Sequence, residues 1–352
     1  MELGTCRKGA MNMWRNDDKW IENFLENYQL KLEFYEDYGK IKKVYTSNGV
    51  FAIKTIDAKT GFDFIRNVQM LYQSGYNRIV PVFPTVDGRY GVLHNDKLSY
   101  IMPWLPDEIS GERTERHQQM FRELARMHTL SAREETIPKE EREEHYEKTV
   151  KTWEEQNDFL AEFLKTAERK WYMSPFEQLY CICSYDISQA LSYSMTKFKA
   201  WYETTKDDEK VRNVITHGNV SIHHYLYSDN GYGHFINFEK TKTAPPYFDL
   251  LPFVVKQLKT YPVQSEETVD WIYLYLKYFP FKPGEMLLFQ SYIAHPGNCI
   301  KILEQYSRKK GSQTEVQYCR KLQRQYWLLK NIEYIIMRME QIEESKKQNQ
   351  QT

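Results

Sequence analysis

The chain has 352 residues, 41% apolar and 27% charged, which suits one large bilobal domain or two modest ones. Its 48 basic and 48 acidic residues cancel, so charge gives no reason to expect a nucleic-acid partner or an anionic membrane surface. No apolar run approaches the roughly 20 residues that cross a bilayer, so we expect no membrane insertion, and nothing near the N-terminus resembles a signal peptide.

The first hundred residues predict one helix followed by strands. Residues 16–28 carry apolar side chains at helical spacing, with Asn16 as the expected N-cap. The pattern becomes strand-like from residue 32 to 56, and it ends in the run Val-Phe-Ala-Ile-Lys at 50–54. This run therefore places Lys54 on a strand that follows a tight turn.

A second helix and further strands are expected next. Residues 62–74 read as a helix, with Gly75 as the glycine just past its end. Residues 79–93 predict two strands around an Asp-Gly turn, and 99–104 predict another strand that enters a linker.

The rest of the chain is predicted to be mostly helical. Residues 115–128 read as a helix, while 133–149 are charge-rich, lack an apolar period and are expected to be exposed. Long helices are expected at about 150–168, 174–205, 266–279, 285–308 and 313–345. The Lys- and Gln-rich tail from Lys346 predicts disorder.

The stretch 216–250 organises the interpretation of the whole sequence. An apolar run leads to His-Gly-Asn at 217–219, and two aromatic-rich runs flank a turn that contains Asn-Gly. Asn-Gly tolerates positive φ at both positions, so a hairpin is predicted there. The hairpin would bring the loop 217–224 close to the loop that begins at Asn237.

This stretch resembles the catalytic core of the aminoglycoside phosphotransferase and choline kinase superfamily. The family pattern is His-Gly-Asp-x-x-x-x-Asn, a hairpin, Ile-Asp-Phe/Trp-Asp/Glu and a later Asp-Leu. The resemblance implies an α+β, bilobal, protein-kinase-like fold, with a small antiparallel β lobe and a larger, mostly helical lobe. We expect the small lobe at 1–103, the helical lobe at 104–345 including the 217–239 motif, and a disordered tail at 346–352.

The scaffold positions of the family pattern match, but the chemical positions do not. Asn219 stands at the catalytic-base position, His224 at a metal-binding Asn, and Asn237 at the main metal-binding Asp. An amide cannot accept a proton at neutral pH, and Mg²⁺ prefers anionic oxygens. Asp249, in contrast, matches the family's structural Asp that braces the catalytic loop. We therefore expect no catalytic residue and no metal site.

The resemblance also implies which residues would contact a nucleotide. Lys54 matches the lysine that binds phosphates, and Met102 and Trp104 lie at the linker that binds adenine. His224 and Asn237 complete the predicted cofactor-binding set. No cofactor is expected to be required, although ATP is a possible ligand.

Two active-site alternatives stay open. Glu239, two residues beyond Asn237, offers a carboxylate to a metal that the asparagine no longer holds, and the chain would then be an ATP-dependent small-molecule phosphotransferase. A transition-metal site at His217, His223 and His224 is the weaker alternative, because no nearby cysteine completes it.

The degenerate core, the retained strand and the length resemble a narrower group, the CotS-type spore-coat proteins of endospore-forming bacilli. That resemblance implies a pseudokinase that assembles the coat through contacts with other coat proteins. It also implies synthesis in the cytoplasm of the mother cell, followed by incorporation into the spore coat.

Lys54 poses a charge problem. The helix position that holds a Glu in active relatives is Asn67 here, and an unpaired buried ammonium costs several kcal/mol or gives up its proton. An open, wet cleft that leaves the lysine hydrated is one solution, but we favour a carboxylate partner. Asp63, one helical turn from Asn67, is preferred over Glu239 because it needs no closure of the lobes.

Overall fold

The computed structural model describes residues 19–61, 63–107, 113–228, 230–308 and 313–351. By its internal contacts the chain divides into two compact units. The first unit contains Met1–Gly111 and Ser221–Lys242, and the second contains Glu112–Val220 and Thr243–Thr352. The chain thus leaves the first unit, builds part of the second, and returns once to the first.

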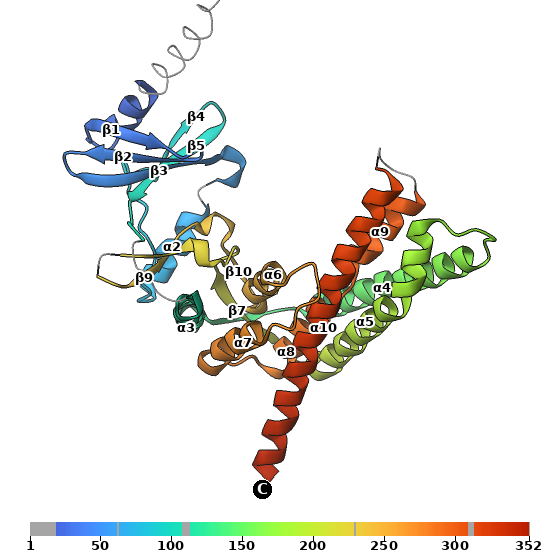
Figure 1. Ribbon diagram of the computed structural model, residues 1–352. Helices are drawn as coiled ribbons and strands as arrows, with labels where there is room; N and C mark the ends of the chain where they lie inside the picture. Colours follow the sequence, from blue (N-terminus) through green and yellow to red (C-terminus); the bar gives the residue numbers. More distant parts are fainter. Residues whose placement is uncertain (1–18, 62, 108–112, 229, 309–312, 352) are drawn as a thin grey trace, which may run out of the picture. The chain divides into compact units, whose positions relative to one another are not determined.

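An antiparallel sheet of five strands forms the frame of the first unit (Figure 1). The strands are β1 (Leu32–Asp37), β2 (Ile41–Thr46), β3 (Gly49–Asp57), β4 (Val92–His94) and β5 (Lys97–Pro103), in the order β1-β2-β3-β5-β4. β3 pairs with β2 on one side and with β5 on the other. Lys54 therefore stands on a strand whose backbone is held from both sides.

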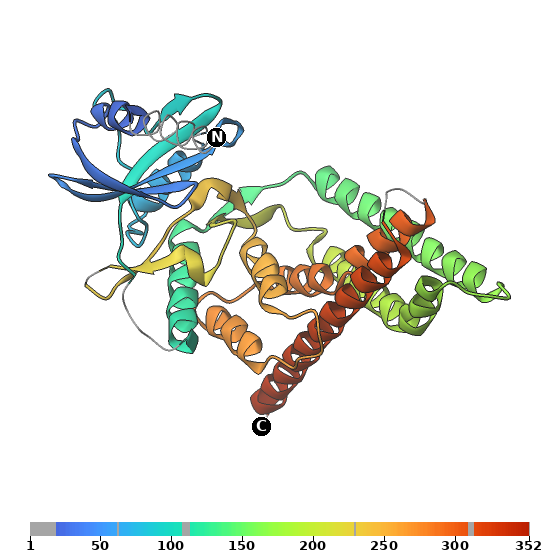
Figure 2. The same ribbon diagram turned by 45° about the horizontal axis from the view of Figure 1, so that its top comes forward.

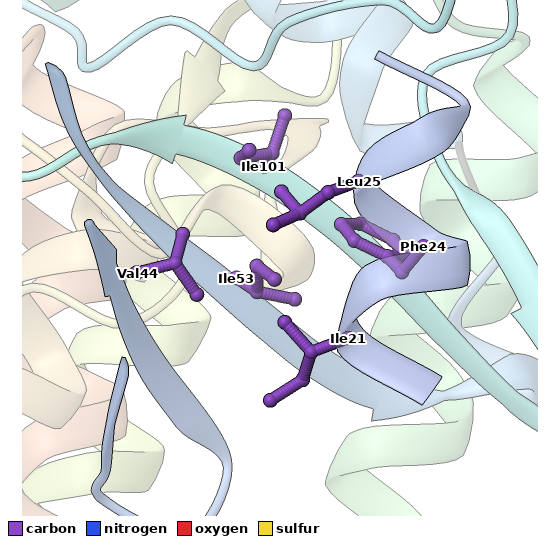
Figure 3. Close-up of a cluster of buried hydrophobic side chains, with 6 residues drawn as sticks. All are labelled: Ile21, Phe24, Leu25, Val44, Ile53 and Ile101. Carbon is purple, nitrogen blue, oxygen red and sulfur yellow. The ribbon is translucent and has the colours of Figure 1, made fainter. Parts of the chain in front are cut away.

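One face of this sheet packs against the helix at residues 19–26. Figure 3 shows the buried cluster between them, which consists of Ile21, Phe24, Leu25, Val44, Ile53 and Ile101. Each of these side chains is at most 2% exposed, and burying a side chain of this size contributes about 1.5–3 kcal/mol. Because side chains alternate along a strand, Lys54 points to the face opposite Ile53.

The segment 221–242 belongs to the first unit because its hairpin is tied to that unit's backbone. The hairpin consists of β8 (Tyr225–Tyr227) and β9 (Gly233–Phe235). The Phe235 N–H donates to the Arg78 carbonyl at 2.9 Å, and the Phe235 carbonyl accepts from the Val80 N–H at 3.0 Å. The expectation that all of 217–239 belongs to the helical lobe is corrected here, since only 217–220 lie in the second unit.

The second unit is mostly helical. Its helices are α3 (Arg113–Ser131), α4 (Lys139–Glu168), α5 (Pro175–Thr205), α6 (Tyr247–Gln257), α7 (Glu266–Tyr278), α8 (Pro283–Ala294), α9 (Gly297–Ser307) and α10 (Glu315–Gln351). A small sheet runs in the order β10-β7-β6, with β6 at Arg133–Thr136, β7 at Lys210–Thr216 and β10 at Lys242–Ala244. In Figures 1 and 2, α4 and α5 lie side by side, and the long α10 packs along α5. Within the described ranges, no helix combines the length and apolar content needed to cross a bilayer.

The prediction of two strands over residues 79–93 is wrong. Two isolated bridges replace the first strand, and regular pairing begins only at Val92. Pro81 and Pro84 lack the N–H groups that a strand needs to extend its ladder. The predicted turn is present, with Gly88 at a φ of 82°.

Three helix predictions also need correction. α4 begins at Lys139, inside the charged stretch that lacks an apolar period, because Glu, Lys and Arg favour helix without one. The helix expected at 285–308 is two helices, interrupted before Pro296, which lacks the N–H to continue the first. The tail from Lys346 is helical to Gln351, since lysine and glutamine extend a helix that packing has already started. Asn16, the expected N-cap, lies outside the described residues.

Candidate functional site

Lys54 is at the centre of a polar cluster on the face of the first unit's sheet opposite Ile53. Its ammonium group forms an ion pair with Oε1 of Glu239 and donates a hydrogen bond to the side-chain oxygen of Asn237. The Tyr100 hydroxyl, from the residue opposite Lys54 on β5, donates to the same Oε1 at 2.5 Å. The Lys54 and Glu239 side chains are only 12% and 11% exposed. The cluster is therefore a largely desolvated ion pair with two further polar partners.

A residue in the left-handed backbone conformation precedes the turn that carries Glu239. Asn237 has φ 68° and ψ 49°, a conformation that asparagine adopts more readily than other residues with a side chain. A single 3₁₀ turn, Phe238–Lys240, follows it and is closed by the Thr241 N–H on the Phe238 carbonyl at 2.8 Å. Phe238 is buried, and the turn contacts α2 (Asp63–Gln73). The turn thereby presents Asn237 and Glu239 together to Lys54.

The protonation states of the cluster follow from its geometry. Burial by itself raises the pKa of the Glu239 carboxyl, but the charge of Lys54 and the hydrogen bonds from Lys54 and Tyr100 outweigh it and lower that pKa. Burial, the negative charge of Glu239 and the hydrogen bond to it together raise the pKa of Tyr100 well above its usual value. At neutral pH Glu239 is an anion, and Tyr100 is a neutral donor.

The linker predicted to contact adenine has its first amide already engaged. The Trp104 N–H donates to the Val50 carbonyl at 3.1 Å, and Pro103 has no N–H to offer. The Lys43 ammonium lies 4.9 Å from the centre of the Trp104 ring, within cation–π range. Met102 is buried in β5. The backbone donor and one ring face that a base would use at Trp104 are thus occupied by the protein itself.

His224 lies next to Asn237 through the backbone. It ends the 3₁₀ turn Ile222–His224, and its carbonyl accepts the N–H of Ile236 at 3.0 Å. The side chain is half-buried. In the part of the chain that the structure describes, no group of three or more His, Cys, Asp or Glu residues could hold a metal ion, and this includes the cluster of histidines considered above.

The His-Gly-Asn loop belongs to the second unit, where Asp249 holds its backbone. Asp249 is fully buried and accepts the N–H groups of His217 and Gly218, both at 2.7 Å. His128 Nε2 lies 3.1 Å from the same carboxylate, and its Nδ1 lies 2.6 Å from the Tyr275 hydroxyl. Burial raises the pKa of Asp249, but the hydrogen bond and charge of His128 are among the effects that bring it below its usual value. Asp249 occupies the bracing role that the sequence predicted.

Lys256 is the residue that sequence reasoning missed. Its ammonium donates to Oδ1 of Asn219 at 2.7 Å, while the Asn219 N–H donates to His217 Nδ1 at 3.2 Å. Lys256 and Asp249 both lie on α6, a helix that the sequence analysis did not predict. Their spacing of seven residues, which places them on one helical face, was the available signal. The position predicted for a catalytic base thus holds an amide beside a cation.

Among the comparisons with known proteins, only the one with solved structures finds matches, and these bear on the fold. No protein-family profile and no curated protein matches the sequence. An aminoglycoside phosphotransferase from Alicyclobacillus acidocaldarius superposes with a TM-score of 0.68 at 14% identity, covering 92% of this chain and 96% of that one. Spectinomycin phosphotransferase, APH(9)-Ia, crystallised with ADP and spectinomycin, gives 0.51 at 12% identity, with coverage of 90% and 98%. The chain has the aminoglycoside phosphotransferase fold.

The structure confirms the predicted fold but gives Lys54 a different partner from the one predicted. The α+β kinase-like architecture is confirmed, and so is the proximity of Lys54 and Asn237. The preferred partner of Lys54 was wrong: Asp63 is exposed at the start of α2, and the ion pair forms with Glu239. Glu239 needs no lobe closure, because it belongs to the same unit as Lys54. The nucleotide contacts assigned to Lys54, Met102, Trp104, His224 and Asn237 stay predictions.

Proposed function

We propose that the chain is a kinase-like protein that does not transfer phosphate and acts through binding to other proteins. The observation that carries this proposal is the ion pair of Lys54 with Glu239. In phosphoryl transfer, such a lysine neutralises phosphate charge and a carboxylate holds the metal. Here the lysine and the nearest carboxylate neutralise each other, and Asn237 adds only a neutral oxygen. Neither group is left for the reaction.

The His-Gly-Asn loop supports the same proposal from the second unit. Orienting an acceptor hydroxyl and taking its proton requires a carboxylate, and such acid–base assistance contributes about 10²–10⁴-fold to rate. Asn219 supplies an amide oxygen that already accepts from Lys256. A neighbouring cation disfavours any proton transfer to that side chain. Asp249 meanwhile keeps the loop ordered, so the loop is retained without its chemistry.

We extend the proposal to spore-coat assembly on the strength of the sequence resemblance to CotS-type proteins. The chain would be made in the cytoplasm of the mother cell and then join the coat by contacts with other coat proteins. No cofactor is required for this role. Its support is the degenerate core and the retained strand, and the fold comparisons speak only to the kinase-like architecture.

The alternative is an active small-molecule phosphotransferase, and one observation favours it. Glu239 lies beside Asn237 on the same short turn, so a metal could use its carboxylate if the ion pair with Lys54 opened. The shared fold with phosphotransferases is compatible with this alternative. It predicts turnover that depends on Mg²⁺ or Mn²⁺.

The test is a transfer assay with the full chain, labelled ATP, Mg²⁺ or Mn²⁺, and aminoglycoside, choline and sugar acceptors. We expect no transfer above that of Asn219→Ala, which removes the amide at the base position. Metal-dependent transfer by the wild-type chain that disappears in Asn219→Ala would contradict the proposal and support the alternative.

A second experiment addresses the coat role. Affinity-tagged chain, expressed in a sporulating bacillus, is recovered from purified coat fractions and its co-purifying proteins are identified. We expect coat proteins to be enriched over a tagged, unrelated cytoplasmic protein of similar size. Recovery of the chain only in the cytoplasmic fraction, throughout sporulation, would contradict the coat role but leave the absence of phosphotransfer untouched.

A further inference from the structure

Two hydrogen-bond donors of the first unit, Lys54 and Tyr100, come from paired strands and converge on one point. Lys54 is in the middle of β3, and Tyr100 faces it from β5, so both donors are fixed by strand pairing on one sheet. Their ammonium and hydroxyl groups converge on one oxygen atom, Oε1 of Glu239. Two donors, one of them charged, that converge on one acceptor are what a phosphate oxygen also requires.

The acceptor in this site, unlike the donors, comes from a short and separate segment. Glu239 lies on the single turn Phe238–Lys240, and its side chain has three rotatable bonds. A change of side-chain rotamer would withdraw the carboxylate without disturbing the sheet. Lys54 would then be left with the neutral oxygen of Asn237, and a buried ammonium without a counter-ion is costly. Withdrawal of Glu239 therefore favours entry of another anion.

We propose that the Glu239 carboxylate is a built-in competitor that occupies the Lys54–Tyr100 anion site, so that a polyphosphate binds the first unit only by displacing it. This inference rests on the proposed function and adds a regulation to the same site. The ligand class is a nucleoside polyphosphate or an inorganic polyphosphate. Both carry the acceptor oxygens that the two donors recognise, and no metal is needed for the first contact.

Removing the charge of Glu239 should expose the site. Glu239→Gln keeps the length of the side chain but removes the ion pair, so Lys54 would seek an external anion. We expect tripolyphosphate and ATP, both with EDTA present, to bind the full-length variant at least tenfold more tightly than the wild type, as measured by calorimetry. ATP that binds more tightly than tripolyphosphate would show that the base adds contacts. Equal affinities would show that the phosphates alone are recognised.

Matched variants test whether loss of the Glu239–Lys54 ion pair causes the expected gain in anion affinity. Asp63→Asn removes one negative charge from the same unit without touching Lys54, and it should leave affinity unchanged. Lys54→Ala combined with Glu239→Gln should abolish the gain. Glu239→Ala is the second variant in case the glutamine side chain itself bonds Lys54 or destabilises the fold, and circular dichroism confirms that each protein is folded.

The outcomes separate this inference from the proposed function. Equal anion affinity of the wild type and both Glu239 variants would overturn the built-in competitor. An equal gain in Asp63→Asn would overturn it as well, because net charge would then explain the effect. Tighter binding by Glu239→Gln accompanied by metal-dependent transfer to an acceptor would uphold the competitor and contradict the proposed absence of phosphotransfer.

Discussion

Asp249 is the residue on which the geometry of the His-Gly-Asn loop depends. Its carboxylate, which is fully buried, accepts hydrogen bonds from two backbone N–H groups and contacts His128. Asp249→Asn would turn an N–H₂ group toward at least one of these donors and leave it unsatisfied. We expect a loss of about 2–4 kcal/mol in the free energy of unfolding, measured by urea denaturation. Asp270→Asn, at an exposed position of α7, is the control and should cost less than about 0.5 kcal/mol. A similar, small effect of both substitutions would refute the bracing role.

Glu239 should make stability depend on pH in the acidic range. Its pKa is lowered from an ordinary 4.5, so its contribution is fully present above that value and is lost as the pH falls through the folded-state pKa. Glu239→Gln lacks this contribution at every pH. The wild type should therefore unfold at a higher temperature than the variant near neutral pH, and the difference should shrink below about pH 4.5. A difference in thermal midpoint that stays constant from neutral to acidic pH would show that the carboxylate is not charged in the fold.

At the scale of elements, the β8–β9 hairpin depends on a close approach between a glycine and an aromatic ring. A Cβ added to Gly233 would lie 2.2 Å from the ring of Tyr225. Tyr225 is two positions before Tyr227, which pairs with Gly233 across the hairpin. Gly233 has no positive φ, so steric contact alone excludes a side chain there. The hairpin leads directly into Asn237 and Glu239, so its position controls the polar cluster at Lys54.

Gly233→Ala should therefore destabilise the chain. We expect a cost of about 1–3 kcal/mol, the usual range for overpacking a well-packed site. The measurement is a double-mutant cycle with Tyr225→Leu, which removes the ring that the new methyl group would meet. Gly233→Ala should cost clearly less in the Tyr225→Leu background than in the wild type. Strictly additive effects would place the strain elsewhere.

At the scale of the molecule, the two asparagines at the predicted base and metal positions belong to different units. Asn237 lies in the first and Asn219 in the second. Each already has a lysine on its side-chain oxygen, Lys54 for Asn237 and Lys256 for Asn219. Introducing carboxylates at these two positions would thus create an ion pair in each unit rather than two free carboxylates.

Asn219→Asp combined with Asn237→Asp should therefore fail to restore phosphotransfer. We expect measurable Mn²⁺ binding by calorimetry, because carboxylate oxygens suit the ion, but turnover within twofold of the wild-type background. Adding Lys256→Ala removes the competing cation in the second unit and serves as the matched comparison. Robust turnover in the double variant alone would show that only the carboxylates were missing and that the acceptor contacts persist.

The sequence by itself determined the architecture and the position of the His-Gly-Asn loop. Strand alternation, turn residues and helical periodicity are local signals, and they predicted the strands that hold Lys54 and the hairpin before Asn237. The strand prediction failed at residues 79–93, where two prolines interrupt the ladder and Ile79 forms a single bridge to the distant β9. The prolines were visible in the sequence, whereas the bridge was not. Residue types alone also predicted that the base and metal positions carry amides in place of carboxylates.

Only the tertiary structure decided which groups neutralise one another. Helical spacing pointed to Asp63, one turn from Asn67, as the partner of Lys54. The partners in the structure are Asn237, 183 residues away in sequence, and Glu239 on the turn that follows it. Likewise, the contact of Lys256 with Asn219 depends on how α6 is placed beside the His-Gly-Asn loop. The attraction between two charges weakens with their separation and strengthens as burial lowers the dielectric around them. Which charges form a pair is therefore set by packing between segments, which no local pattern in a single sequence records.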